Sequence, residues 1–171
     1  MSEMNPVVPQ VIVPPVDQQQ HEQYMREVQA VQLRAGIKSC ANWFYWIAGL
    51  SLVNSVSAIS GSNWRFVLGL GITQIVSEIA KNMGSAGQGA AFIVNLFIAG
   101  IFILFGYVSN QHRRWAFVVG MLFFGIDTLI LLLAMDIIGI AFHIYAMYWI
   151  FKGYQLVGQL QVLEPAPRQG F

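Results

Sequence analysis

A chain of 171 residues in which only 10% of side chains are charged and 56% are apolar departs strongly from soluble domains, which carry roughly 25% charged residues. Its net charge of +1 provides no basic field for nucleic acid, so we expect no nucleic-acid partner. The single cysteine, Cys40, excludes an internal disulfide and cysteine-rich zinc sites. Charged residues gather at the ends of long apolar stretches, and this clustering predicts an all-α integral membrane protein.

The N-terminal region divides into two predicted segments. Residues 1–16 are rich in Pro, Gln and Val, and prolines remove donors and fix φ, so a disordered tail is predicted. Residues 17–38 are predicted to form a cytoplasmic amphipathic helix, with Asp17 as N-cap and Tyr24 and Val28 on its apolar face. This juxtamembrane helix is expected to lie at the membrane surface and to lead into the first span.

The membrane domain is predicted over residues 39–160 as a bundle of four transmembrane helices. The spans are expected at about 41–59, 90–109, 115–134 and 137–152. The first run covers about 28 Å at 1.5 Å per residue, which matches the hydrocarbon thickness.

Three connections complete this map. Met135 and Asp136 form a short hairpin between the last two spans. The GSAGQG stretch at residues 84–89 predicts a flexible linker before the second span, and residues 161–171 predict a polar C-terminal tail.

Residues 64–82 form an apolar helical pattern that carries Gln74 and Glu78 near its centre. Eight large apolar residues contribute about −4 kcal/mol to insertion, while each central amide or charge costs about +2 to +3.5 kcal/mol. This segment is therefore not expected to insert alone. We predict an outer amphipathic helix or a re-entrant helix, with a fifth span as the alternative.

Charge decides between the maps. With four crossings, six basic residues face one side, whereas five crossings divide the basic residues about evenly. The six are Arg26, Arg34, Lys38, Arg113, Arg114 and Lys152. The positive-inside rule favours four crossings with both termini cytoplasmic, and we place the protein in the bacterial inner (plasma) membrane.

Ionisable and amide side chains inside predicted spans are functional candidates because burial in lipid is costly unless they are paired. Asp127 and His143 lie about 13 and 11 Å from the Asp136 hairpin, at nearly equal depth, and are expected to pair. Asn54 and Asn95 lie in the same outer half, beneath the predicted outer helix. The candidate intramembrane polar cluster therefore comprises Asp127, His143, Asn54, Asn95, Gln74 and Glu78.

Each candidate has a structural alternative. Asp127 and His143 fit either a pair that fixes the hairpin or a proton relay, and the first is favoured. Asn54 and Asn95 fit hydrogen bonds between helices better than ligand groups.

The motifs that would indicate catalysis are missing from the sequence. It has no HExxH helix and no GxGxxG or Walker loop, and the run Phe124 to Asp127 lacks the second glycine of the GxGD motif of intramembrane aspartyl proteases. Three scattered histidines do not form a metal set. We therefore assign no catalytic residue, no cofactor and no metal.

These absences favour a non-enzymatic accessory, scaffold or interaction subunit. Its expected partners are the lipid bilayer and either a second copy of the chain or another membrane protein. The alternative is an oligomeric small transporter or channel built around Asp127, His143, Asn54 and Asn95. A third, weaker hypothesis is an intramembrane enzyme that uses Asp127 or His143 for acid–base work.

Overall fold

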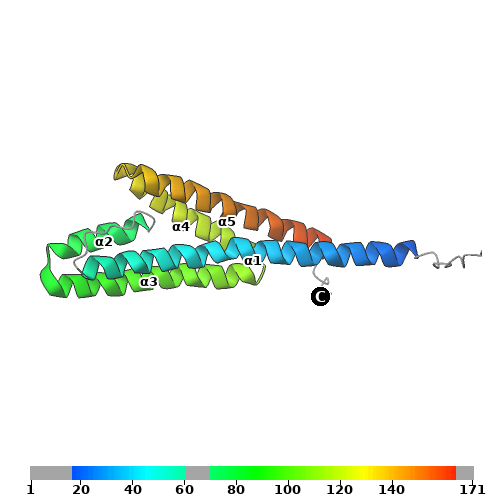
Figure 1. Cartoon of the computed structure of the whole chain (residues 1–171), viewed down its shortest axis with the longest axis horizontal. Coiled ribbons are helices and arrows are strands. Elements are labelled where there is room, and N and C mark those ends of the chain that lie inside the picture. The colour runs from blue at the N-terminus through cyan, green and yellow to red at the C-terminus, as the bar shows by residue number, and fades with distance from the viewer. Residues whose placement is uncertain (1–16, 61–69, 165–171) are drawn as a thin grey trace, which may run out of the picture.

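The computed structural model describes residues 17–60 and 70–164, and over these residues the chain is helical with no strand (Figure 1). The helices are α1 (Gln18–Ile59), α2 (Gly71–Lys81), α3 (Gly84–Asn110), α4 (Arg114–Leu133) and α5 (Ile137–Leu163). The predicted all-α class is confirmed. The predicted tail over 1–16, the first part of the 64–82 segment and residues 165–171 lie outside the described residues.

Helix α1 is continuous over 42 residues, where the sequence predicts a surface helix followed by a separate span. Asp17 caps it as predicted, since its side chain accepts a hydrogen bond from the Gln19 N–H at 3.3 Å. The first half of α1 does not turn aside, because Ala30 and Leu33 are buried in the same core as Leu160 of α5. An Arg34–Glu164 ion pair at 2.7 Å also joins the two helices.

The flexible linker predicted over residues 84–89 is wrong, because α3 begins at Gly84. Gly84 adopts a φ of +71°, which closes the turn from α2. Gly87 packs so closely on α2 that an added Cβ would lie 2.7 Å from the Ala80 carbonyl oxygen. These glycines allow close approach of two helices instead of giving flexibility.

The long helices run alternately up and down, so the bundle has two ends (Figure 1). The Met135 end holds the end of α1, the α2–α3 turn and the α4–α5 hairpin; the His112 end holds the α3–α4 turn and the end of α5. Met135 and His112 have φ values of 55° and 60°, which allow both hairpins to be short. The predicted short hairpin at Met135 and Asp136 is confirmed, with Asp136 as N-cap of α5.

Helix α2 differs from the others because it starts inside the bundle. Its 11 residues cover about 16 Å, which is too short to cross a bilayer of about 30 Å. Leu70 and Thr73 at its beginning are 0% and 2% exposed, and the helix then runs out to the Met135 end (Figure 1).

The half of the bundle toward the His112 end is filled by a phenylalanine core from α1, α3 and α4. The core consists of Phe44, Phe102, Phe105, Phe117 and Phe124, all buried. Phe44 lies at the centre, with ring centroids 6.0 to 6.5 Å from those of Phe102, Phe105 and Phe117. Such tilted ring packing fills space densely without polar atoms.

Two helices, α3 and α4, are long and apolar enough to cross a membrane by length and composition. They correspond to the second and third predicted spans. Helices α1 and α5 carry more polar side chains over the same length, such as Asn54 in α1 and His143 in α5. Length and composition alone therefore support two of the four predicted spans.

Gly153 of α5 offers a test of helix packing, since a Cβ there would lie 2.8 Å from the Cβ of Cys40 and against the Phe117 ring. We expect Gly153→Ala to lower the free energy of unfolding by about 1–3 kcal/mol through overpacking. Gly100 of α3 is the matched control, because an added Cβ meets nothing within 4 Å. Gly100→Ala should stabilise the protein by about 0.5–1 kcal/mol through helix propensity. Thermal unfolding in detergent measures both variants. Equal changes in stability for Gly153→Ala and Gly100→Ala would contradict the close packing of Gly153 against α1 and α4.

Candidate functional site

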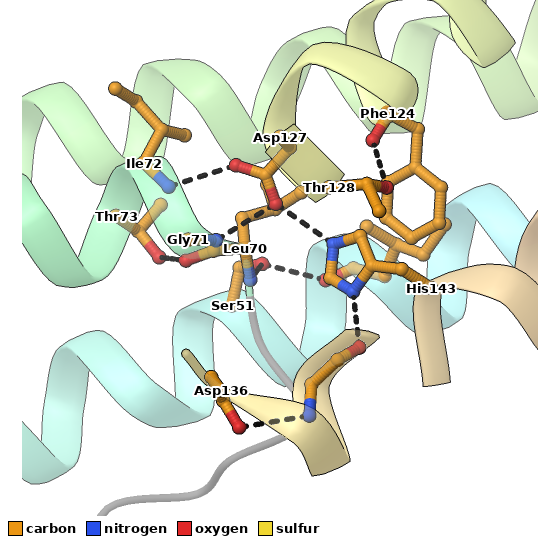
Figure 2. Close-up of polar contacts among 12 residues, drawn as sticks. Ser51, Leu70, Gly71, Ile72, Thr73, Phe124, Asp127, Thr128, Asp136 and His143 are labelled. Atoms are coloured by element: carbon orange, nitrogen blue, oxygen red, sulfur yellow. Dashed lines mark hydrogen bonds and ion pairs between the residues drawn. The ribbon is translucent and has the colours of Figure 1, made fainter. Parts of the chain in front are cut away.

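Asp127 is a buried carboxylate of α4, only 3% exposed, that caps the first turn of another helix. Its Oδ2 accepts a hydrogen bond from the Gly71 N–H and its Oδ1 accepts one from the Ile72 N–H, both at 2.8 Å (Figure 2). The N-cap residue of α2 itself, Leu70, has no side-chain acceptor. The carboxyl group therefore lies at the positive end of α2 and accepts hydrogen bonds from two N–H groups that the helix leaves unpaired.

The predicted pairing of Asp127 with His143 is confirmed. His143 of α5 is fully buried, and its Nε2 lies 2.8 Å from Asp127 Oδ2. Its ring stacks on Phe124 with a centroid distance of 4.1 Å. Phe124 thus separates the pair from the rest of the phenylalanine core.

Both ring nitrogens of His143 have hydrogen-bond partners within the protein. Nδ1 lies 2.9 Å from the Gly139 carbonyl oxygen, and Nε2 lies 2.8 Å from Asp127 Oδ2 (Figure 2). The imidazole is therefore held between the backbone of its own helix and a carboxyl group of α4.

Ser51 of α1 and Thr73 of α2 complete the contacts around the start of α2. The Leu70 N–H donates to Ser51 Oγ at 3.2 Å, and Ser51 donates in turn to the Ile47 carbonyl at 2.9 Å. Thr73 Oγ1 donates to the Leu70 carbonyl at 2.7 Å. Three consecutive N–H groups, those of residues 70–72, thus bond to side chains of α1 and α4.

The amide candidates lie about one helical turn nearer the Met135 end. Asn95 of α3 is 1% exposed and donates from Nδ2 to Ser77 Oγ at 3.1 Å and to the Thr73 carbonyl at 3.5 Å. Within the described part of the chain, neither amide atom of Asn54 has a hydrogen-bond partner, and neither do Gln74 Nε2 and Asn95 Oδ1.

Glu78 differs from the other five candidates, because it is exposed on α2. The cluster of six as a whole stays a prediction: the structure joins Asp127 to His143, and Asn95 to Ser77 and Thr73 of α2. Gln74 precedes Glu78 by four residues, so helical periodicity places these two side chains on the same face of α2.

Sequence reasoning missed Ser51 and missed that Asp127 acts as a helix cap. One signal was available: the run Leu70-Gly71-Ile72 starts a helix without Ser, Thr, Asp or Asn at its N-cap. A buried helix start of this kind needs an acceptor from elsewhere in the chain. Gly71 also fits this place because a Cβ there would lie 2.9 Å from the Leu131 side chain of α4.

The geometry supports structural work more directly than chemistry. The three polar contacts of the Asp127 carboxyl group are all with groups of the protein. Both ring nitrogens of His143 also contact groups of the protein. Over residues 17–60 and 70–164, no three His, Cys, Asp or Glu side chains come together as a metal site would require. The comparisons add no candidate chemistry: no protein-family model, curated protein or solved structure matches this chain.

Asp127→Ala and His143→Ala should each destabilise the detergent-solubilised protein, and Asp127→Ala should cost more because it also removes the cap of α2. We expect about 3–5 kcal/mol for Asp127→Ala. The double variant should cost less than the sum of the two by about 0.5–3 kcal/mol. Unfolding titrations of the four proteins measure this coupling.

Asp17→Ala provides the control for additivity. This substitution removes the N-cap of α1, which is at the opposite end of that helix from the part that packs near Asp127. Its effect on the free energy of unfolding should therefore add to that of Asp127→Ala. If the effects of Asp127→Ala and His143→Ala on the free energy of unfolding also added, the contact between the two side chains would not stabilise the protein.

Proposed function

We propose that this chain is a four-span membrane protein that acts as a non-enzymatic scaffold or accessory subunit. In this proposal the spans are α3, α4, α5 and the part of α1 that follows Lys38, and α2 is a re-entrant helix. Two of these helices meet the length and composition expected of a span. The remaining steps rest on exposed side chains, charge and the surroundings of Asp127.

The exposed surface supports four spans. Each long helix presents large apolar side chains outward, as a lipid-facing helix must. Examples are Trp46 and Val53 of α1, Ile93 and Phe97 of α3, Leu122 and Leu133 of α4, and Ile138 and Ile144 of α5. Contiguous exposure of this kind would be unfavourable in water.

The position of α2 supports re-entry over a position on the surface. Its first residues are buried beside Asp127 and Ser51, and its last residues reach the Met135 end, where α1 also ends. Irregular backbone at membrane depth is tolerated where protein groups satisfy it, as they do at the start of α2.

The distribution of basic residues supports cytoplasmic termini. The His112 end carries Arg113 and Arg114 in the α3–α4 turn, and it also holds Arg34, which pairs with Glu164. Exposed Trp46, Tyr107 and Trp115 lie on the same half and would form an interfacial belt. By the positive-inside rule this end faces the cytoplasm, and the membrane would be a bacterial inner membrane.

A single observation carries the functional proposal: Asp127 and His143 make their polar contacts with groups of the protein, and phenylalanine rings pack on the side of the pair toward the His112 end. Phe124 stacks directly on His143, and Phe44, Phe102 and Phe105 continue the packing toward the His112 end. Among the described residues, these rings lie between the Asp127–His143 pair and the His112 end. This arrangement favours a scaffold that holds α2 in place over a transporter.

The topology can be tested with single cysteines, because wild-type Cys40 is 1% exposed and provides an unreactive background. We expect Ser60→Cys and Asn82→Cys to react with a membrane-impermeant maleimide from the same side of sealed vesicles. Gln111→Cys should react only from the opposite side. Labelling of the first two from opposite sides would indicate five crossings and would exclude re-entry.

The functional class can be tested in proteoliposomes. We expect no flux of protons, alkali ions or halide above that of empty liposomes, for wild type and Asp127→Asn alike. A wild-type flux that Asp127→Asn abolishes would replace the scaffold proposal with the oligomeric transporter. In parallel, a tagged copy extracted gently from native membranes should retain a membrane-protein partner at fixed stoichiometry, or should elute as a homo-oligomer.

A further inference from the structure

Three carboxamide side chains, on α1, α2 and α3, have buried polar atoms that no group in the described part of the chain pairs with. They are Asn54 Oδ1 and Nδ2, Gln74 Nε2 and Asn95 Oδ1. Asn95 is 1% exposed, so its unpaired oxygen lies deep in the protein. The structural role of Asp127 and His143 does not use any of these atoms.

Contacts along the helices place the three amides at one level. Phe44 of α1 packs on Phe105 of the antiparallel α3. Asn54 is ten residues after Phe44 and Asn95 is ten residues before Phe105, so equal steps bring the two amides to the same height.

Helix α2 brings Gln74 to the same level. Asn95 donates to the Thr73 carbonyl and to Ser77, which flank Gln74 in sequence. On the α1 side, the Leu70 N–H donates to Ser51, and α1 and α2 both run from there toward the Met135 end (Figure 1). One helical turn further along each helix brings Gln74 and Asn54 to about the same level.

The unpaired atoms comprise two donors and two acceptors. Each buried polar atom left unsatisfied costs about 1–3 kcal/mol, so four of them would be a heavy penalty inside an apolar bundle. A cation would be repelled by the two NH₂ groups, and an anion by the two oxygens. Water donates and accepts equally and commonly bridges buried groups of this kind.

We propose that Asn54, Gln74 and Asn95 form a binding site for ordered water between α1, α2 and α3. The water links the side chain of α1, which has no protein partner, to the two helices that face it. Together with the Ser51 and Thr73 hydroxyls, it extends the polar layer from the Asp127–His143 pair toward the Met135 end. The site does not depend on the scaffold role.

Asn54 provides the decisive variant, because its amide has no protein partner to lose. Asn54→Val should lower the unfolding temperature of the solubilised protein by several degrees, since the water then loses its contacts with α1. If the site is dry, the same change removes an unsatisfied amide and should leave the unfolding temperature unchanged or raised. Asn42→Val is the matched control on the same helix, where the asparagine is exposed, and it should have little effect.

Two further measurements keep the proposal falsifiable if Asn54→Val does not fold. A wild-type structure in lipid nanodiscs that resolves water should show density within hydrogen-bonding distance of both Asn54 and Asn95, and no density there would overturn the proposal. The unfolding temperature of wild type should not change when Na⁺ is replaced by K⁺ or N-methylglucamine. An ion-specific change would assign the site to a cation instead.

Discussion

The carboxyl group of Asp127 joins three helices. It caps α2, belongs to α4 and contacts Nε2 of His143 of α5. A buried carboxylate and a buried helix start are each unfavourable alone, because each loses its hydration. Placed together, the carboxylate accepts the N–H groups that the helix start presents, and the imidazole supplies the remaining contact. An ionisable residue thus persists inside an apolar helix for a structural reason.

The rest of the bundle is divided at the level of this pair. Toward the His112 end, phenylalanine rings pack on one another; toward the Met135 end, a hydroxyl of α1 and an amide of α3 bond to α2. Phe124 forms the boundary, since one face of its ring stacks on His143 and its edge meets Phe102. The apolar half holds the long helices in register, and this register in turn brings Asn54 and Asn95 to one height.

Much of this arrangement could be predicted from periodicity and helical rise. The all-α class and the Met135 hairpin follow from apolar run lengths and turn residues, and the Asp127–His143 contact follows from equal distances to that hairpin. What could not be predicted depends on long-range packing. The glycines at residues 84–89 resemble a linker until α2 is placed against them, and Asp127 becomes a cap only when Gly71 lies beside it. Glu78 was grouped with the amides by depth, and its exposure on α2 follows from the packing of that helix, which the sequence does not show.

The short length of α2 explains why the buried pair matters for the shape of the Met135 end. A helix of 11 residues is marginal on its own, because nucleation costs more than so few hydrogen bonds return. Its stability must therefore come from its fixed start and from burial against α3. The exposed side chains of α2, Ile75 and Ile79 among them, are held in position by that start. The surface at this end thus depends on the hydrogen bonds that Asp127 and Ser51, on two other helices, accept from the start of α2.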